Sequence, residues 1–258
     1  MEIHPTAVVD PGAKLEEGVK IGPYVIINKD ALIGAGTEIM AHAHIDSNTR
    51  IGCNCRVFPL ASLGTAPQDV TYAGEKTRLT IGDEVTIREF VTVNRGTAKG
   101  GGVTRIGDGC YLMTYAHVGH DCQIGRNVTL INNLAMSGHV TVEDEATISG
   151  MVAIHQHVRI GTHAYIGGVS RVTKDVPPYL LGQGVGDFKL YGPNIIGLKR
   201  KGFPRETISA LREAFHLIFR TNRLLAETLE DALARFPDVK EVKTMVEFIQ
   251  SSKRGVTR

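Results

Sequence analysis

The chain has 258 residues, and its 42% hydrophobic and 22% charged content is typical of a globular protein with one large domain or two ordinary ones. No stretch approaches the roughly 20 apolar residues of a membrane span, and the N-terminus lacks the pattern of a secretory signal. With no tryptophan and only 6% aromatic residues, the core must be built from small and aliphatic side chains. We therefore expect a cytoplasmic protein without a membrane span.

The net charge of +2 conceals an asymmetry along the chain. Residues 190–258 hold 13 Lys/Arg and 8 Asp/Glu, a net of +5, so the remainder holds 16 and 19, a net of −3. A basic C-terminal segment suits an acidic partner, although solvated helix faces give the same balance. No nucleic-acid partner is expected.

A large aliphatic residue recurs at every sixth position from the N-terminus onward. The register holds over residues 3–63, resumes over 81–93, and continues one residue out of phase over 106–172. A small or β-branched residue stands four positions further on in most repeats, and three of the four cysteines, Cys55, Cys110 and Cys122, occupy this slot. Cysteines placed there, with no CxxC pair, are predicted to be buried free thiols and not metal ligands.

A period of six fits neither an α-helix nor a plain alternating strand. It is typical of a parallel β-helix in which each hexad forms one short strand and a turn, and three hexads close one triangular coil. The sequence predicts this fold for residues 1–190.

Two segments interrupt the repeat, near 65–80 and near 95–105. Interruptions of a solenoid need a reason, because continuing the repeat is simpler. The second contains three consecutive glycines, which are typical of a flexible loop and are weak support for phosphate binding.

The hexads stop after Pro177 and Pro178. Apolar residues then recur at helical spacing, which predicts helices over 204–221, 224–236 and 239–251 within an α-helical C-terminal domain of residues 191–258. These helices are expected to cover the end of the prism and to pack on neighbouring chains, because a solenoid exposes unpaired strand edges at its ends.

Six of the ten histidines lie between residues 117 and 163, and none takes either buried slot of the hexad: His117, His120, His139, His155, His157 and His163. His120 directly precedes Asp121, and an imidazole oriented by a carboxylate is the arrangement that a general base needs near neutral pH. Adjacent strand residues diverge, so the pair meets only if it lies near a turn. His157 and His163 fit polar positions on the outer face equally well.

Seven segments of the chain match a known family: 67–75, 95–97, 117–122, 137–140, 155–156, 175–179 and 197–203. In these segments the chain resembles the UDP-N-acetylglucosamine O-acyltransferases of the hexapeptide-repeat acyltransferase superfamily, which catalyse the first step of lipid A synthesis. The resemblance covers essentially the whole length.

The resemblance implies a left-handed β-helix that transfers a (3-hydroxy)acyl chain from acyl carrier protein to the 3-position of UDP-N-acetylglucosamine. His120 is then the general base, Asp121 holds its tautomer, and the Gly138 N–H stabilises the developing oxyanion. No cofactor and no metal are implied. The family is a homotrimer whose sites lie between adjacent prisms.

The same resemblance implies a set of substrate-binding residues. Asp69 contacts the sugar, Gly168 limits the length of the acyl chain, and the remaining residues line the nucleotide-sugar or acyl site: His117, His139, His155, Gln156, Asn194 and Arg200. Three positions depart from the family pattern, since Thr71 stands where lysine is usual, Asn94 where histidine is usual and Lys201 where arginine is usual. Each is expected to affect sugar preference or affinity.

Four other functions compete with this interpretation. The first is the same reaction on a 3-amino UDP-sugar, which acylates nitrogen. A zinc hydratase of the γ-carbonic anhydrase type uses three histidines on the same coil, but it does not need the basic helical tail. The N-acyltransferase that acts later in the pathway carries an extra domain before its repeats, and a non-catalytic scaffold needs no His-Asp pair.

Overall fold

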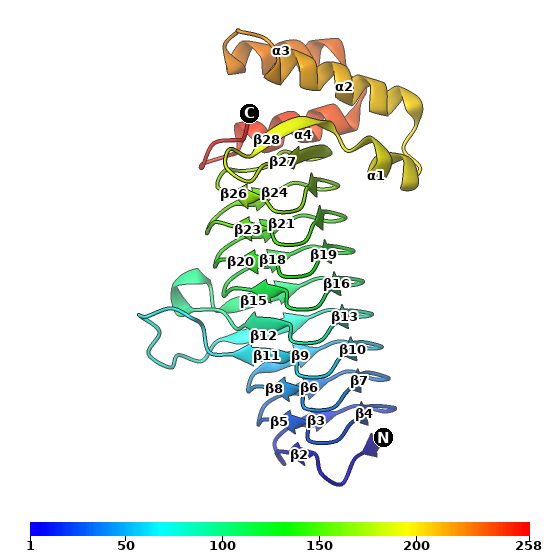
Figure 1. The fold of residues 1–258 in the computed structure, drawn as a ribbon, viewed down its shortest axis with the longest axis vertical. Helices are drawn as coiled ribbons and strands as arrows, with labels where there is room; N and C mark the ends of the chain where they lie inside the picture. Colours follow the sequence, from blue (N-terminus) through cyan, green and yellow to red (C-terminus); the bar gives the residue numbers. More distant parts are fainter.

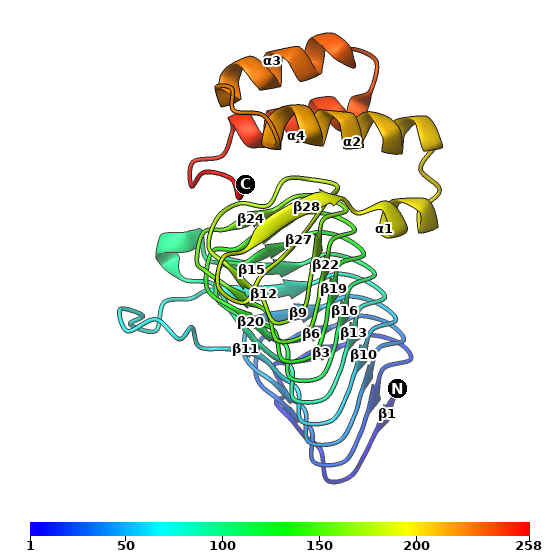
Figure 2. The same cartoon turned by 45° about the horizontal axis from the view of Figure 1, so that its top comes forward.

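The computed structural model describes all 258 residues. Short strands wind into a three-sided prism, and helices cover its C-terminal end (Figure 1). The predicted parallel β-helix is therefore confirmed, and Figure 2 shows its triangular outline.

Each side of the prism is one sheet. The first sheet contains, in spatial order, β1 (Glu2–Ile3), β4 (Lys20–Ile21), β7 (Glu38–Ile39), β10 (Arg56–Val57), β13 (Thr86–Ile87), β16 (Tyr111–Leu112), β19 (Thr129–Leu130), β22 (Thr147–Ile148), β25 (Tyr165–Ile166), β27 (Leu180–Gln183) and β28 (Lys189–Pro193). The second contains β2 (Val8–Val9), β5 (Ile26–Ile27), β8 (His44–Ile45), β11 (Ser62–Thr65), β14 (Thr92–Asn94), β17 (His117–Val118), β20 (Ala135–Met136), β23 (Ala153–Ile154) and β26 (Arg171–Val172). The third contains β24 (Arg159–Ile160), β21 (Thr141–Val142), β18 (Gln123–Ile124), β15 (Val103–Ile106), β12 (Arg78–Ile81), β9 (Thr49–Ile51), β6 (Leu32–Ile33) and β3 (Lys14–Leu15).

Parallel pairing stacks equivalent residues of successive coils. Ile3 pairs with Ile21, Ile21 with Ile39 and Ile39 with Val57, so each partner lies three hexads further along the chain. The second residue of a two-residue strand points inward, so the aliphatic position of every hexad joins one continuous core. Each buried side chain of this kind contributes about 1.5–3 kcal/mol relative to an exposed one.

The two interruptions are insertions of different length. Ile51 pairs with Ile81, and Ile81 pairs with Ile106, so both steps exceed the three hexads of a regular coil. The first step is longer by two whole hexads, which leaves the sequence register unchanged. The second is longer by one hexad and one further residue. This difference explains why the phase of the repeat shifts only at the second interruption.

The corners of the prism place many non-glycine residues in the left-handed backbone region. This conformation costs about 1–2 kcal/mol per residue for most side chains. Corner side chains of neighbouring coils stack on one another and offset part of that cost: Tyr24 lies 5.0 Å from His42, and Phe90 lies 4.7 Å from Tyr115, between ring centroids.

Four helices follow the last coil: α1 (Ile195–Arg200), α2 (Arg205–Phe219), α3 (Leu225–Arg235) and α4 (Lys240–Gln250). The three predicted helices are confirmed to within two residues, whereas α1 was not predicted. β28 runs antiparallel to β27, and α2 to α4 cover the end of the prism (Figure 2). None of the four helices has the length and apolar character needed to cross a membrane.

We expect Leu112→Ala to lower the free energy of unfolding by about 2–5 kcal/mol, because Leu112 is fully buried between coils and its truncation leaves a cavity. Chemical denaturation followed by circular dichroism measures this change. The control is Thr129→Ala, an outward-facing threonine on the next strand of the same sheet, which should change stability by less than about 0.5 kcal/mol. Equal effects of the two variants would contradict the core assignment.

Candidate active site

Both insertions and three of the six clustered histidines lie on one edge of the prism, where the second sheet turns into the third. We call it the loop edge. Loop 1 (66–77) leaves it between β11 and β12, and loop 2 (95–102) leaves it one coil later between β14 and β15. The next three turns on this edge are 120–121, 138–139 and 156–157. Segments far apart in the sequence therefore share this edge, and Figure 1 shows the two loops leaving the same side of the prism.

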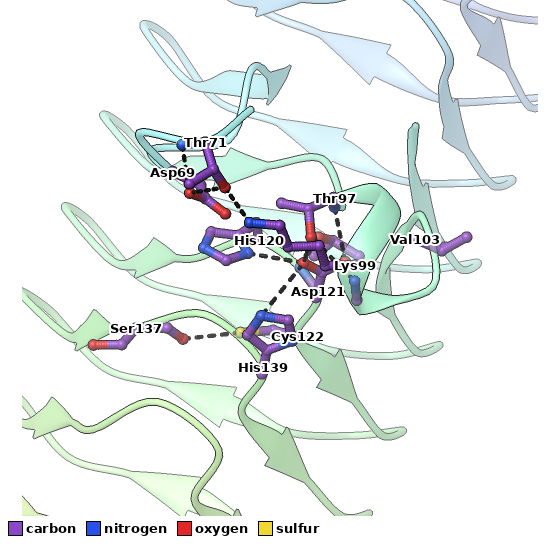
Figure 3. Close-up of polar contacts among 12 residues, drawn as sticks. Asp69, Thr71, Thr97, Lys99, Val103, His120, Asp121, Cys122, Ser137 and His139 are labelled. Carbon is purple, nitrogen blue, oxygen red and sulfur yellow. Dashed lines mark hydrogen bonds and ion pairs between the residues drawn. The ribbon is translucent and has the colours of Figure 1, made fainter. Parts of the chain in front are cut away.

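His120 and Asp121 do meet at a turn. The Nδ1 atom of His120 lies 2.8 Å from Asp121 Oδ2, and Asp121 is buried with 4% exposure (Figure 3). Because an ionised carboxylate only accepts hydrogen bonds, Nδ1 carries the proton and Nε2 keeps a free lone pair. The pair thus has the tautomer that a general base requires.

Loop 2 fixes the Asp121 carboxylate. The Thr97 N–H donates to Oδ1 at 2.8 Å, and the Thr97 hydroxyl donates to Oδ2 at 2.7 Å. A Cβ atom at Gly100 would lie 2.0 Å from Asp121 Cγ, so only glycine allows loop 2 to approach this closely. This contact gives Gly100, the first residue of the glycine run, a packing role that the sequence left open, whereas a Cβ atom at Gly101 would meet nothing within 4 Å. The support from Thr97 was not predicted, although Thr97 stands in the 95–97 segment that carries the resemblance.

Gly138 packs directly against the His120 ring. A Cβ atom there would lie 2.5 Å from His120 Cε1 and 2.7 Å from Nε2. Its N–H has no backbone acceptor, so this turn next to the His120 ring carries an unused donor.

A groove of about 460 Å³ opens beside His120 on the second sheet. Its wall includes the predicted residues His117, His155, Gln156 and Gly138. The His117 Nδ1 atom lies 2.8 Å from the Thr92 hydroxyl, which orients the ring.

Nine of the 14 residues that line the groove were not predicted as site residues, and Gln68, Asn94 and Arg171 are the longer polar side chains among them. Asn94 was noted only as a departure from the family pattern. It is buried and donates to Thr65 Oγ1 at 3.1 Å and to the Ala66 carbonyl at 2.9 Å, so it joins loop 1 to the prism.

His139 belongs to a stack of imidazoles on the loop edge. Its ring meets His120 edge-on at 5.1 Å and lies parallel to His157 at 4.6 Å, between centroids. His139 Nε2 is 3.8 Å from Asp121 Oδ2. The sequence left the role of His157 open, and the structure places it in this stack, whereas His163 lies on another edge between Tyr179 and Phe203.

Asp69 extends from loop 1 towards His120. Hydrogen bonds from the Thr71 N–H and hydroxyl, opposed by desolvation, hold the pKa of Asp69 below its usual value, and the charges of Lys99 and His120 add to this effect. Asp69 therefore remains an acceptor for a ligand at neutral pH.

Asn194, Arg200 and Gly168 are not part of this groove. Asn194 caps α1, accepting from the Gly197 N–H at 3.1 Å and donating to the His163 carbonyl at 3.1 Å. Figure 1 shows α1 on the side of the prism opposite the loops. Gly168 lies on the edge between the first and second sheets, where a Cβ atom would stand 3.3 Å from the Gly150 carbonyl oxygen.

The ligand atoms of His120, Asp121 and His139 lie within 4.8 Å of one another. Thr97 donates to both oxygens of Asp121, and His120 directs Nδ1 at the carboxylate. A metal ion on Asp121 would displace these donors. This donor set fits a hydrogen-bonded acid–base pair better than a metal centre.

Comparison with known proteins identifies the family. The chain is 46% identical over 257 residues, 100% of its own length and 99% of the relative's, to the acyl-[acyl-carrier-protein]–UDP-N-acetylglucosamine O-acyltransferase of Thermodesulfovibrio yellowstonii. It is 44% identical over the full length of both chains to the protein of the same name from Syntrophobacter fumaroxidans. The chain belongs to the UDP-N-acetylglucosamine O-acyltransferase family.

Models of protein families and solved structures agree with this assignment. Residues 175–257 match the second domain of UDP-N-acetylglucosamine O-acyltransferase, and residues 104–130 match the bacterial transferase hexapeptide repeat. The fold superposes on UDP-N-acetylglucosamine acyltransferase of Francisella novicida with a TM-score of 0.96 and 39% identity, covering 99% of this chain and 94% of that one. The predicted left-handed winding is that of this family.

Burial lowers the pKa of His117 and His139 below the usual value. As pH falls through about 6.5, the unfolded chain therefore binds protons before these folded-state histidines do. The free energy of unfolding should decrease over this range, and the decrease should end below the folded-state pKa values. Urea denaturation between about pH 7.5 and pH 5 measures the slope, which His117→Gln should make shallower. Identical slopes for the two proteins would contradict the shift.

Proposed function

We propose that this enzyme uses His120 as the general base in transferring an acyl chain from acyl carrier protein to the 3-hydroxyl of UDP-N-acetylglucosamine, the committing step towards lipid A. The class of reaction follows from membership of the family. The observation that supports the base is the His120–Asp121 hydrogen bond of 2.8 Å, which in the neutral ring places the proton on Nδ1 and leaves the lone pair of Nε2 for the substrate.

In the proposed mechanism, His120 Nε2 takes the proton of the sugar hydroxyl as that oxygen attacks the thioester carbonyl. The Gly138 N–H stabilises the oxyanion of the tetrahedral intermediate. When the intermediate collapses, the C–S bond breaks, and the carrier thiolate leaves and receives the proton from the His120 imidazolium. Asp121 stabilises that imidazolium and keeps the ring oriented throughout.

The remaining predicted residues are assigned to binding. Asp69 binds the sugar, while His139 on the loop edge and the groove residues His117, His155 and Gln156 bind the rest of the two substrates. We propose that Gly168 limits the acyl chain, so that a larger side chain there shortens the chain accepted. The names of the relatives favour oxygen over nitrogen as the acceptor atom.

We propose that the active enzyme is a homotrimer in which α1 completes the site of a neighbouring chain. Asn194 and Arg200 lie away from the groove of their own chain, so they can serve a groove only across an interface. The edge between the first and second sheets exposes a ladder of apolar side chains, which supports self-association: Tyr24, Leu60, Phe90, Tyr115, Met151 and Val169.

Two further proposals concern the setting of the reaction. The basic C-terminal segment, with its excess of Lys/Arg over Asp/Glu, is proposed to attract the acidic carrier protein. All four cysteines are free thiols, which is usual in a reducing compartment and supports a cytoplasmic location.

We expect the purified protein to acylate UDP-N-acetylglucosamine, and His120→Ala to lower kcat by about 10²–10⁴-fold because the base is lost. A panel of 3-hydroxyacyl carrier proteins, offered with the sugar nucleotide and its 3-amino analogue, measures acyl length and acceptor atom. His216→Ala, an exposed histidine of α2 that does not line the groove, is the matched control and should retain activity. A near-normal rate for His120→Ala would refute the base.

The shared site predicts complementation between two inactive variants. His120→Ala and Arg200→Ala, co-expressed and co-purified, should assemble trimers in which some sites combine an intact His120 with an intact Arg200 of the neighbour. Random pairing of equal amounts gives about one quarter of the wild-type activity. Separately purified variants mixed at low temperature are the control, and light scattering measures the mass of the assembly. If co-expressed trimers recover no activity, His120 and Arg200 do not serve one site across an interface, and the shared site is refuted.

A further inference from the structure

Lys99 is one of two cations that join the two loops at the candidate active site, the other being Arg95, which donates to the Tyr72 hydroxyl. The Lys99 ammonium group donates to the Thr71 hydroxyl, and Figure 3 shows this contact above the His120–Asp121 pair. Thr71 in turn donates its hydroxyl to Asp69 Oδ1 at 2.8 Å, and its N–H to the same oxygen at 2.8 Å. The three side chains form a continuous chain of hydrogen bonds from a cation on loop 2 to an anion on loop 1.

The backbone that carries Lys99 is fixed by the catalytic pair. Lys99 lies in the short 3₁₀ helix Ala98–Gly100, whose N-cap is Thr97. Thr97 holds both oxygens of Asp121, and Gly100 packs on the same carboxylate. One side of loop 2 therefore positions Asp121, while its other side directs Lys99 across to loop 1.

This arrangement leaves unused hydrogen-bonding capacity facing the site. An ammonium group has three donors, of which Thr71 takes one. Asp69 Oδ1 receives both bonds from Thr71, so Oδ2 is free to accept. The pair offers donors and an acceptor side by side, which matches the hydroxyl and carbonyl oxygens of an amino sugar.

We propose that Lys99 is a substrate-binding residue, which acts with Asp69 to bind the amino-sugar end of the sugar nucleotide. This inference rests on the proposed function and deepens it. The family resemblance leads us to expect a lysine at position 71, where this chain has Thr71. Lys99 supplies a positive charge next to that position. The Lys99 ammonium does not contact Asp69 directly, and the Thr71 hydroxyl bridges the two side chains by accepting from Lys99 and donating to Asp69.

The proposal predicts a specific rescue. Lys99→Met should raise KM for UDP-N-acetylglucosamine about tenfold or more, the effect of losing a hydrogen bond to a charged group. The kcat and the KM for the acyl donor should change by less than about twofold, since Lys99 does not contact the reacting atoms in this assignment. Adding Thr71→Lys to the Lys99→Met protein should restore most of the loss, because the new ammonium stands beside Asp69.

Lys76→Met is the matched control. Lys76 is an exposed lysine of loop 1 that lines a separate groove on the third sheet, so its loss removes the same charge outside the site. It should leave every kinetic constant within about twofold of the parent. Melting curves of all variants report whether the loops remain folded.

Calorimetric titration of UDP-N-acetylglucosamine into the parent, Lys99→Met and the double variant separates this inference from the proposed function. If the parent transfers no acyl group but binds the sugar nucleotide with Lys99 dependence, the proposed reaction fails and the inference holds. An unchanged KM and affinity in Lys99→Met would overturn the inference, as would an equal loss in Lys76→Met. A rise in KM confined to the acyl donor, or a double variant no better than Lys99→Met, would also overturn it.

Discussion

Stacking of each coil on the one before it is the constraint on which the rest of the structure depends. A residue pairs with its equivalent in the next coil, so each inward aliphatic side chain packs on the aliphatic side chain of the next coil, and together they form one continuous core. The same translation stacks corner residues, which places Asp121, His139 and His157 in one line at left-handed backbone positions. The candidate active site therefore occupies positions whose backbone conformation the fold already sets, and the stability of the packed core compensates for that strain.

The insertions turn a regular edge into a site without disturbing the core. Loop 1 adds two hexads to its coil and loop 2 adds one hexad and one residue, yet the strands on either side stay paired because both loops leave at a corner. Loop 2 then returns to support Asp121, and loop 1 brings Asp69 towards His120. At a corner, a solenoid can accept extra residues without breaking the pairing of its strands, and the inserted loop can then form one wall of a groove.

The sequence predicts the prism well because every coil repeats the same two buried slots. The left-handed winding of the coil was predicted only from the family resemblance. A left-handed and a right-handed coil place the same residues of each hexad inside and outside, so the repeat does not distinguish them. The His120–Asp121 pair was predicted from adjacency, but its hydrogen bond depends on the turn. Thr97 and Lys99 contact residues more than a full coil away in the sequence, and no periodicity indicates such pairs. The helix α1 has only six residues, too few for a helical period of apolar residues to be recognised. The division of the chain into two domains at residue 190 stays a prediction.

Loops stacked on one edge also change how a departure from a family pattern is interpreted. A missing lysine on loop 1 looks like a lost function when loop 1 is considered alone. Because loop 2 lies one coil away and is fixed on Asp121, a lysine there is linked to the Asp69 carboxylate through the Thr71 hydroxyl. Electrostatic stabilisation depends on where the charge lies and not on which residue carries it. In a solenoid, the charges of a site are therefore best counted along an edge, across coils, and not along a single segment of sequence.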